Sequence, residues 1–438
     1  MQKKIISIDL NTIKTTILDR EQEIKKPLSE QTLISRTIEL EKIKKIISYD
    51  LITIITGVRR CGKSTLAIEL CIPGNFGYVN FEDERLRIDS EGLNKVMEAL
   101  YDIKGKDLET IIFDEIQNVP GWESFVSRLI GSKKLIITGS NARLMSKELG
   151  TALTGRHIDF ELFPFDFHEF LNYVGIKFDK NEIYLTENKA LLLKTLEEYM
   201  LKGGFPIGIK NGSTYLLELY DDIIVRDIIQ RHNIRNINGV KGVLRYISSN
   251  SSEMSYSKLS RIFNNISSQT IAKWINYAED SYLIIKIERY SKKLKEQFLA
   301  PKKIYAIDTG IITSLIDENK NQKGKLMENI VAIELIRRNS YFSNKNTEVN
   351  YWKDYEQREV DFLVRIGNTV KELIQVSYVV DTFEKSNREF KSLLKASEEL
   401  SCNNLLIITW DQIGDIQIGE KKISLKPLYL WLLEKYTT

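Results

Sequence analysis

The chain has 438 residues, of which 42% are hydrophobic and 28% are charged, and its formal net charge is +3. This length exceeds what one hydrophobic core usually serves, so we expect two to four domains of ~100–200 residues each. A net charge this small excludes no class of partner by itself, and any basic surface must be local. The three cysteines include no CxxC pair and the three histidines are scattered, which argues against both a disulfide scaffold and a zinc site.

The N-terminal region carries no segment that predicts export or membrane insertion. Residues 1–35 are expected to be a polar extension, with a hairpin or a pair of strands at its front, and they lack the apolar stretch of a signal peptide. No apolar run in the sequence approaches the ~20 residues that a membrane span needs. The sequence therefore predicts a cytoplasmic protein without membrane contact.

The strongest motif follows a short apolar run, Leu51–Thr56, whose β-branched residues are typical of a buried parallel strand. Directly after it, Gly57–Ser64 reads GVRRCGKS and matches the phosphate loop G-x-x-x-x-G-K-[ST], the Walker A motif, without a mismatch. Its glycines let successive backbone N–H groups face phosphate oxygens, and the positive end of the following helix faces the same oxygens. The motif predicts a site for a nucleoside triphosphate.

Two side chains of this loop have specific expected roles. Lys63 is expected to reach the β- and γ-phosphates, and the hydroxyl of Ser64 is expected to ligate Mg²⁺. The full set predicted to bind the nucleotide is Gly57, Val58, Arg59, Arg60, Cys61, Gly62, Lys63, Ser64 and Thr65.

A pair of carboxylates ends the next buried strand, Thr110–Phe113, about 50 residues after the phosphate loop. Asp114 is expected to hold Mg²⁺ through water, and Glu115 is expected to orient and deprotonate the attacking water. The surrounding pattern alternates helices with strands: a helix with Thr37 as N-cap, a strand at Phe76–Phe81, a helix from Pro120 and a strand at Lys134–Thr138. This order predicts a parallel α/β sheet with the nucleotide at the carboxyl ends of its strands.

Several motifs together resemble those of a group of prokaryotic, archaeal-type AAA+ ATPases close to the STAND branch. They read GVRRCGKST, FDEIQ, TGSNARL, LTGRHIDFELFPFDFHEFL and KIYAIDTG, and the resemblance covers nearly the whole chain after Ser35. It implies an AAA+ core over residues 36–165 and a helical lid over residues 166–236. It also implies that Ser140 or Asn141 is the sensor at the end of the fourth strand. Arg156 would approach the γ-phosphate, in its own subunit or from a neighbouring subunit of a homo-oligomer, and would stabilise transition-state charge.

Residues 237–310 are predicted to form a winged helix-turn-helix. A short helix, a turn at Asn264-Asn265 and a second helix capped by Ser267-Ser268 precede two strand-like runs. The residues between and beside these runs carry seven positive charges and two negative ones, a net of +5: Lys286, Arg289, Lys292, Lys293, Lys295, Lys302 and Lys303 against Glu288 and Glu296. We expect this basic wing to contact DNA through Lys292, Lys293 and Lys295, although winged helices also serve as protein-binding modules.

Residues 311–438 resemble the PD-(D/E)xK nuclease fold, with a helix followed by three strands. The positions that match its metal ligands and its lysine are Glu328, Asp361, Gln375 and Ser377. Because an amide and a hydroxyl stand where an acid and a lysine are expected, efficient cleavage is not expected. We interpret this α/β domain as a degenerate nuclease fold that contacts nucleic acid or protein.

The sequence as a whole predicts an ATPase, a hydrolase that uses ATP and Mg²⁺ and produces ADP and phosphate. Its catalytic residues are expected to be Lys63, Glu115, Ser140, Asn141 and Arg156. Hydrolysis would drive a rearrangement of the C-terminal half on DNA. Two alternatives remain open: a metal-dependent DNA nuclease regulated by ATP, and a nucleotide switch that acts on a protein partner without nucleic acid.

Overall fold

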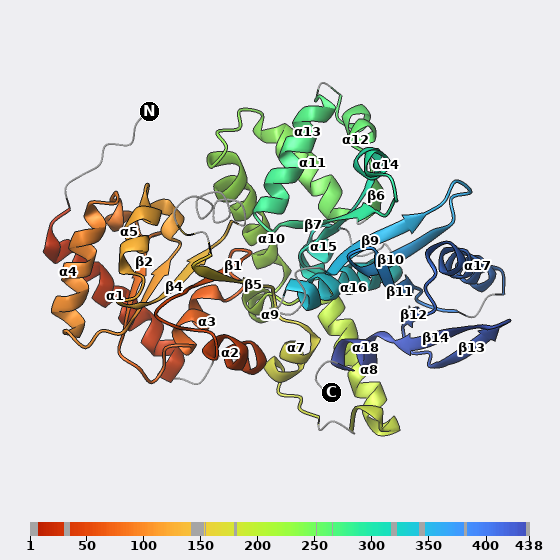
Figure 1. Ribbon diagram of the computed structural model, residues 1–438, viewed down its shortest axis with the longest axis horizontal. Coiled ribbons are helices and arrows are strands. Elements are labelled where there is room, and N and C mark those ends of the chain that lie inside the picture. The colour runs from red at the N-terminus through yellow and green to blue at the C-terminus, as the bar shows by residue number, and fades with distance from the viewer. Residues whose placement is uncertain are drawn as a thin grey trace. The chain divides into compact units, whose positions relative to one another are not determined.

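The computed structural model describes residues 8–29, 36–141, 153, 155–178, 182–250, 252–264, 266–316, 322–340, 347–380 and 383–434. Three predicted features therefore lie wholly or partly outside the described residues: positions 142–144 of the TGSNARL motif, Thr154 and Asn265. The chain divides into two compact units, Met1–Leu162 and Phe163–Thr438 (Figure 1). No helix among the described residues combines the length and the apolar character needed to cross a membrane.

The first unit is built on a five-stranded sheet in the order β2-β3-β4-β1-β5, and every neighbouring pair is parallel. This confirms the predicted parallel α/β sheet. Its central strands are buried along almost their whole length, which explains their continuous apolar runs. The strands are β1 (Ile52–Gly57), β2 (Phe76–Asn80), β3 (Thr110–Asp114), β4 (Lys134–Gly139) and β5 (His157–Leu162).

Helices and short turns connect these strands. The longer helices are α1 (Leu10–Ser29), α2 (Thr37–Lys44), α3 (Lys63–Glu69), α4 (Gly92–Lys104) and α5 (Trp122–Leu129), and the single 3₁₀ turns are η1 (Glu84–Leu86) and η2 (Ile116–Asn118). Thr37 is the first residue of α2 rather than its N-cap, because Arg36 takes the cap position.

The predicted hairpin near the N-terminus is wrong for the described residues, because helix α1 occupies most of the segment. Ile13 and Ile17 lie on one face of this helix and are buried in the same hydrophobic core as Val96 of α4. Their spacing of four residues places both side chains on one side of a helix. The N-terminal segment therefore packs as part of the first unit.

The second unit begins with helices, as the predicted lid requires. They are α7 (Phe167–Tyr173), η3 (Glu182–Tyr184), α8 (Thr186–Lys202), α9 (Pro206–Asn211), α10 (Ser213–Asp222), the π-helical segment η4 (Ile223–Gln230) and α11 (Ile237–Ser249). Gly203, Gly204 and Phe205 separate α8 from α9.

A nine-stranded sheet forms the rest of the second unit, in the order β13-β14-β12-β11-β10-β9-β7-β8-β6. The strands are β6 (Ser252–Met254), β7 (Ile284–Arg289), β8 (Lys302–Ala306), β9 (Thr347–Lys353), β10 (Glu359–Ile366), β11 (Thr369–Val376), β12 (Leu405–Thr409), β13 (Gly414–Ile418) and β14 (Lys421–Pro427). The accompanying helices are α12 (Tyr256–Ile262), α13 (Ser268–Asp280), α14 (Leu294–Leu299), α15 (Thr309–Leu315), α16 (Lys323–Ser340), α17 (Phe383–Leu400) and α18 (Leu428–Leu433).

The predicted wing and the predicted nuclease-like region share this sheet. Strands β7 and β8 pair antiparallel, and β7 also pairs in parallel with β9 at Glu288–Asn350 and Arg289–Tyr351. The two predicted helices of the helix-turn-helix are present as α12 and α13. The two strand-like runs of the predicted wing are present as β7 and β8, and helix α14 lies in the segment between them.

Candidate functional site

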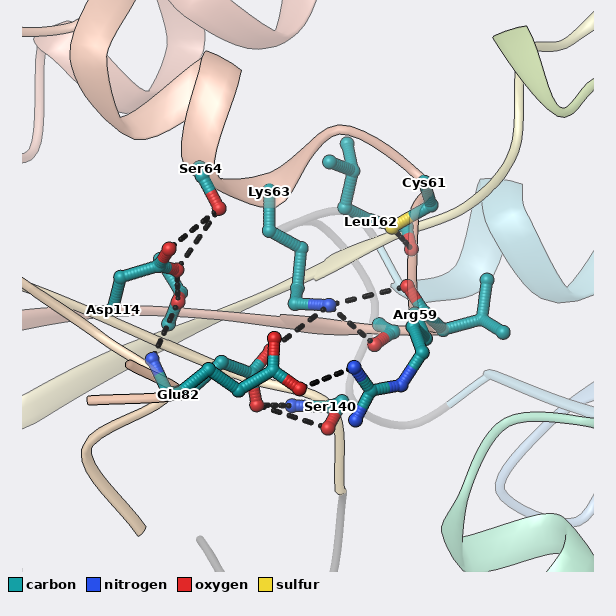
Figure 2. A network of polar contacts seen from close by, with 12 residues as sticks. Arg59, Cys61, Lys63, Ser64, Glu82, Asp114, Ser140 and Leu162 are labelled. Carbon is teal, nitrogen blue, oxygen red and sulfur yellow. Dashed lines mark hydrogen bonds and ion pairs between the residues drawn. The ribbon is translucent and has the colours of Figure 1, made fainter. Parts of the chain in front are cut away.

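The phosphate loop follows strand β1 and is closed against the end of strand β5. Gly57 has a φ of +145°, and a Cβ atom at this position would lie 2.1 Å from the carbonyl oxygen of Leu162. The buried thiol of Cys61 donates to the same oxygen at 3.4 Å (Figure 2). Gly62, with a φ of +102°, then turns the chain into helix α3. Only glycine fits position 57, so packing against Leu162 requires the first glycine of the motif in addition to the expected chemistry of the loop.

Lys63 places a buried positive charge at the centre of this loop. Its side chain is 4% exposed, and its ammonium donates to the carbonyl oxygens of Gly57 and Val58, both at 3.1 Å. The same ammonium lies 3.5 Å from a carboxylate oxygen of Glu115. A cation held by neutral carbonyls inside a loop of N–H groups is suited to pair with phosphate oxygens.

Asp114 lies at the end of β3 and is surrounded by hydroxyl groups. Ser64 donates to its two carboxylate oxygens at 3.0 and 2.8 Å, Tyr78 donates at 2.5 Å, and Thr138 also donates to it. Burial, together with the charge of Glu115, raises the pKa of Asp114 above its ordinary value. The contact between Ser64 and Asp114 brings together the two predicted Mg²⁺ ligands (Figure 2).

Glu115 follows Asp114 in a left-handed backbone conformation, with a φ of +55°. Its Oε2 atom accepts hydrogen bonds from the hydroxyl of Ser140 at 2.9 Å, from the backbone N–H of Ser140 at 3.1 Å and from Gln117 at 2.5 Å. Burial alone would raise the pKa of Glu115, but Lys63 and Arg59 outweigh burial and hold this pKa below its ordinary value. The carboxylate is therefore ionised and able to accept a proton. Asn141 is buried at the end of the same strand as Ser140.

Five residues of the site described above were not among the predicted site residues: Arg36, Tyr78, Glu82, Gln117 and Thr138. Arg36 is 5% exposed, and its guanidinium donates to the carbonyl oxygen of Cys61 at 2.9 Å. Arg59 is paired with Glu82, which follows β2 (Figure 2). Arg36 is a single arginine in a polar segment, and no sequence pattern marks it as part of a site. The position of Thr138 at the end of a strand could have indicated that its hydroxyl belongs to the site.

Arg156 lies at the opposite edge of the sheet from the phosphate loop. Strands β1 and β5 are parallel, Ile52 pairs with His157, and the N–H of Ile52 donates to the carbonyl of Arg156. The phosphate loop begins at the other end of β1, roughly 20 Å away at ~3.3 Å per residue. Arg156 therefore precedes a parallel strand at the end of the sheet away from the phosphate loop. Action in its own subunit and action on a neighbouring subunit both stay predictions.

The three lysines predicted to contact DNA are exposed at α14 and just before it. Lys292, Lys293 and Lys295 all face solvent, and Lys293 also pairs with Glu296 at 3.1 Å. The other four basic residues of the predicted wing are held by neighbours: Lys286 by Glu279, Arg289 by the carbonyl of Lys353, Lys302 by Glu288, and Lys303 by carboxylates of the C-terminal region. The net count of +5 thus overstates the charge that is available to a partner.

The structure brings together some of the positions that resemble a nuclease site. Glu328 on α16 and Asp361 on β10 both accept hydrogen bonds from Lys303, at 3.0 and 2.9 Å. The amide oxygen of Gln375 lies 3.4 Å from the backbone nitrogen of Asp361 and accepts its hydrogen. The hydroxyl of Ser377 donates instead to the carbonyl of Val379 at 3.1 Å.

Comparison with known proteins gives a family match for the region around the phosphate loop and two relatives of the chain. Residues 49–171 match the family model described as an AAA domain. The uncharacterized protein MJ1544 of Methanocaldococcus jannaschii is 36% identical, and the match covers 97% of this chain and 99% of that protein. The chain belongs to the same family as this archaeal protein. An uncharacterized protein of Haemophilus influenzae is 27% identical, over 82% of this chain and 90% of that protein.

The remainder of the chain matches two further models, over residues 193–322 and 323–428, each described as a domain of unknown function. Among solved structures, the Walker-type ATPase PABY2304 of Pyrococcus abyssi is 17% identical with a TM-score of 0.44, and the match covers 65% of this chain and 96% of that chain. The AAA domain supports ATP binding and hydrolysis as the general activity of this family member.

Proposed function

We propose that the protein is a Mg²⁺-dependent ATPase whose hydrolysis of ATP to ADP and phosphate drives its second unit to act on DNA. The observation that supports the ATPase most directly is that three hydrogen-bonded pairs lie at one edge of the sheet. They are Lys63 with Gly57, Ser64 with Asp114, and Ser140 with Glu115. These pairs follow β1, β3 and β4, whose carboxyl ends lie at the edge where ligands of open α/β sheets bind.

The residues of the site fit a magnesium ion. Ser64 and Asp114 offer hard oxygen ligands that already lie 2.8 to 3.0 Å from each other, and hydroxyl groups on Tyr78 and Thr138 orient the carboxylate. Bound Mg²⁺ would neutralise charge on the β- and γ-phosphates. Lys63 would exchange its two carbonyl contacts for phosphate oxygens, which are stronger acceptors for an ammonium group.

Glu115 is the proposed general base. Its low pKa keeps it ionised, and the two hydrogen bonds from Ser140 hold its Oε2 atom in place. Ser140 would therefore position the base, and Asn141 is proposed to complete the sensor at the end of β4. Arg156 is exposed and is proposed to act on a neighbouring subunit of a homo-oligomer, because it precedes β5 at the end of the sheet away from its own phosphate loop.

Replacing Arg36 with methionine is expected to weaken ATP binding about tenfold. The guanidinium holds the carbonyl of Cys61 inside the phosphate loop, and a hydrogen bond from a charged donor contributes ~1.5–3 kcal/mol. Titration with a fluorescent ATP analogue would measure the change in affinity. The Arg60→Met variant, which replaces an arginine of the loop itself, would be titrated in parallel. Equal affinity of Arg36→Met and the unaltered protein would show that Arg36 does not support the nucleotide site.

The DNA part of the proposal rests on the exposed lysines at α14. The Lys292→Gln, Lys293→Gln, Lys295→Gln triple variant is expected to lose stimulation of ATP turnover by DNA. Three lost phosphate contacts would also reduce the slope of log affinity against log salt by about 2–3. We would measure turnover with duplex and single-stranded DNA across a salt series. The matched control replaces three exposed lysines outside this segment with glutamine: Lys106, Lys210 and Lys371.

A second candidate function is a nucleotide switch that acts on a protein partner. Leu294, Phe298 and Leu299 of α14 are 69%, 71% and 75% exposed, which is unusual for large apolar side chains on one short helix. Turnover that is indifferent to DNA in the salt series, and unchanged in the lysine variant, would favour this function over action on DNA.

A further inference from the structure

A buried lysine occupies the centre of the carboxylate cluster in the C-terminal region. The side chain of Lys303 is 3% exposed, and its ammonium lies 3.0 Å from Glu328, 2.7 Å from Glu359 and 2.9 Å from Asp361. The cluster joins three separate elements, because Lys303 is on β8, Glu328 on α16, and Glu359 and Asp361 on β10. The nuclease resemblance predicts a lysine at position 377, and the structure instead supplies one from the predicted wing.

Aromatic side chains enclose this ammonium on its remaining sides. The rings of Tyr351 and Phe362 lie with their centroids 5.7 and 5.9 Å from the nitrogen of Lys303. The hydroxyl of Tyr305 donates to Glu328 at 2.7 Å, on the same oxygen atom that accepts from Lys303. The lysine thus has hydrogen-bond acceptors and ring faces on several sides, and the cluster is built around it.

The carboxylates of the cluster are satisfied by groups of the chain itself. One oxygen of Asp361 accepts from Lys303, and the other accepts from the backbone N–H of Val376 at 3.0 Å. Glu359 is shared between Lys303 and Lys353, which lies 3.3 Å from it. Among the described residues, no group of three or more histidine, cysteine, aspartate or glutamate side chains is arranged to hold a metal ion.

We propose that Lys303 is the resident cation of this cluster and takes the place of a divalent metal among Glu328, Glu359 and Asp361. The ammonium stands where a metal ion would need to contact Glu328 and Asp361 together, and a metal ion beside it would be repelled by a buried like charge. The cluster then joins the wing strand to the C-terminal helix and sheet, and it does not cleave nucleic acid. This inference is independent of the ATPase and opposes the nuclease alternative.

The test compares the full-length protein with Lys303→Met in thermal unfolding, with EDTA or with Mn²⁺ alone. Removing one partner of a buried charge cluster is strongly destabilising, so the variant is expected to unfold roughly 10 °C lower in EDTA. Mn²⁺ is expected to restore part of this loss, since Glu328, Glu359 and Asp361 then surround a position that no longer holds a cation. Lys302→Met is the matched control: it removes the neighbouring buried lysine, which pairs with Glu288 and not with this cluster, and should gain no response to Mn²⁺.

If Lys303→Met does not fold, Mn²⁺ binding by the unaltered protein is compared with Mn²⁺ binding by the Glu328→Gln variant. The two proteins are expected to bind Mn²⁺ equally, because both keep Ser64 and Asp114 and the cluster around Lys303 is expected to bind no Mn²⁺ in either. Mn²⁺ binding that Glu328→Gln removes would overturn the proposal. Cleavage of plasmid DNA by the unaltered protein that Asp361→Asn abolishes would overturn it as well.

Discussion

Replacing Lys63 with alanine is expected to abolish tight ATP binding. The ammonium of Lys63 is a buried cation of the phosphate loop, and without it the β- and γ-phosphates would lose the charged donor that now contacts the carbonyls of Gly57 and Val58. Truncating one partner of a buried, hydrogen-bonded charge pair costs about 2–5 kcal/mol, so we expect roughly a hundredfold loss of affinity or more. Titration with a fluorescent ATP analogue would measure it.

The control for this variant is Lys106→Ala, which removes an exposed lysine from the same unit. Because Lys63 also lies beside Glu115, circular dichroism should accompany the titration and show that the sheet is intact. A folded Lys63→Ala protein that binds ATP as tightly as the control would remove the phosphate loop from the proposed function.

Replacing Glu115 with glutamine is expected to leave ATP binding intact and to lower turnover by about 10²–10⁴-fold. The amide cannot accept a proton from water, which is the contribution that general base catalysis makes. Its oxygen can still accept the two hydrogen bonds from Ser140, so the geometry at the end of β4 should be preserved. The variant should therefore retain ATP in a stable complex, which single-turnover measurements with radiolabelled ATP would detect.

The matched control is Glu109→Gln, which changes an exposed carboxylate just before the same strand. If Glu115→Gln hydrolyses ATP as fast as this control, Glu115 is not the base. A loss of binding together with turnover would also contradict the assigned role, since Glu115 is proposed to act on water and not to hold the nucleotide.

Local sequence patterns predict the centre of the candidate site. The phosphate loop and the Asp114-Glu115 pair are each contiguous, and the elements around them are strands and helices with strong apolar signals. The residues that were missed act across the sheet instead. Tyr78 and Thr138 reach Asp114 only because β2 and β4 flank β3, which is a property of strand order and not of spacing along the chain.

Other features of the structure depend on strand direction or on distant contacts. The sequence left open whether Arg156 acts in its own subunit or on a neighbour, and the parallel direction of β5 places the residue at the end of the sheet away from the phosphate loop. Counting charges on the wing failed to show which lysines are exposed, since Lys303 is paired with residues 25 and 58 positions further along the chain. The N-terminal helix could have been predicted, because Ile13 and Ile17 have helical spacing.

The pairing of β7 with β9 has a consequence for how this protein can change over evolutionary time. The two strands lie on either side of the junction between the two models of unknown function, at residues 322 and 323. Separating the segment that contains β7 from the segment that contains β9 would leave two strand edges with unpaired N–H and C=O groups. Such edges can pair with other chains and cause aggregation. Gene fusion or recombination that transferred only one of the two segments would expose these edges, so we expect the two segments to be inherited together.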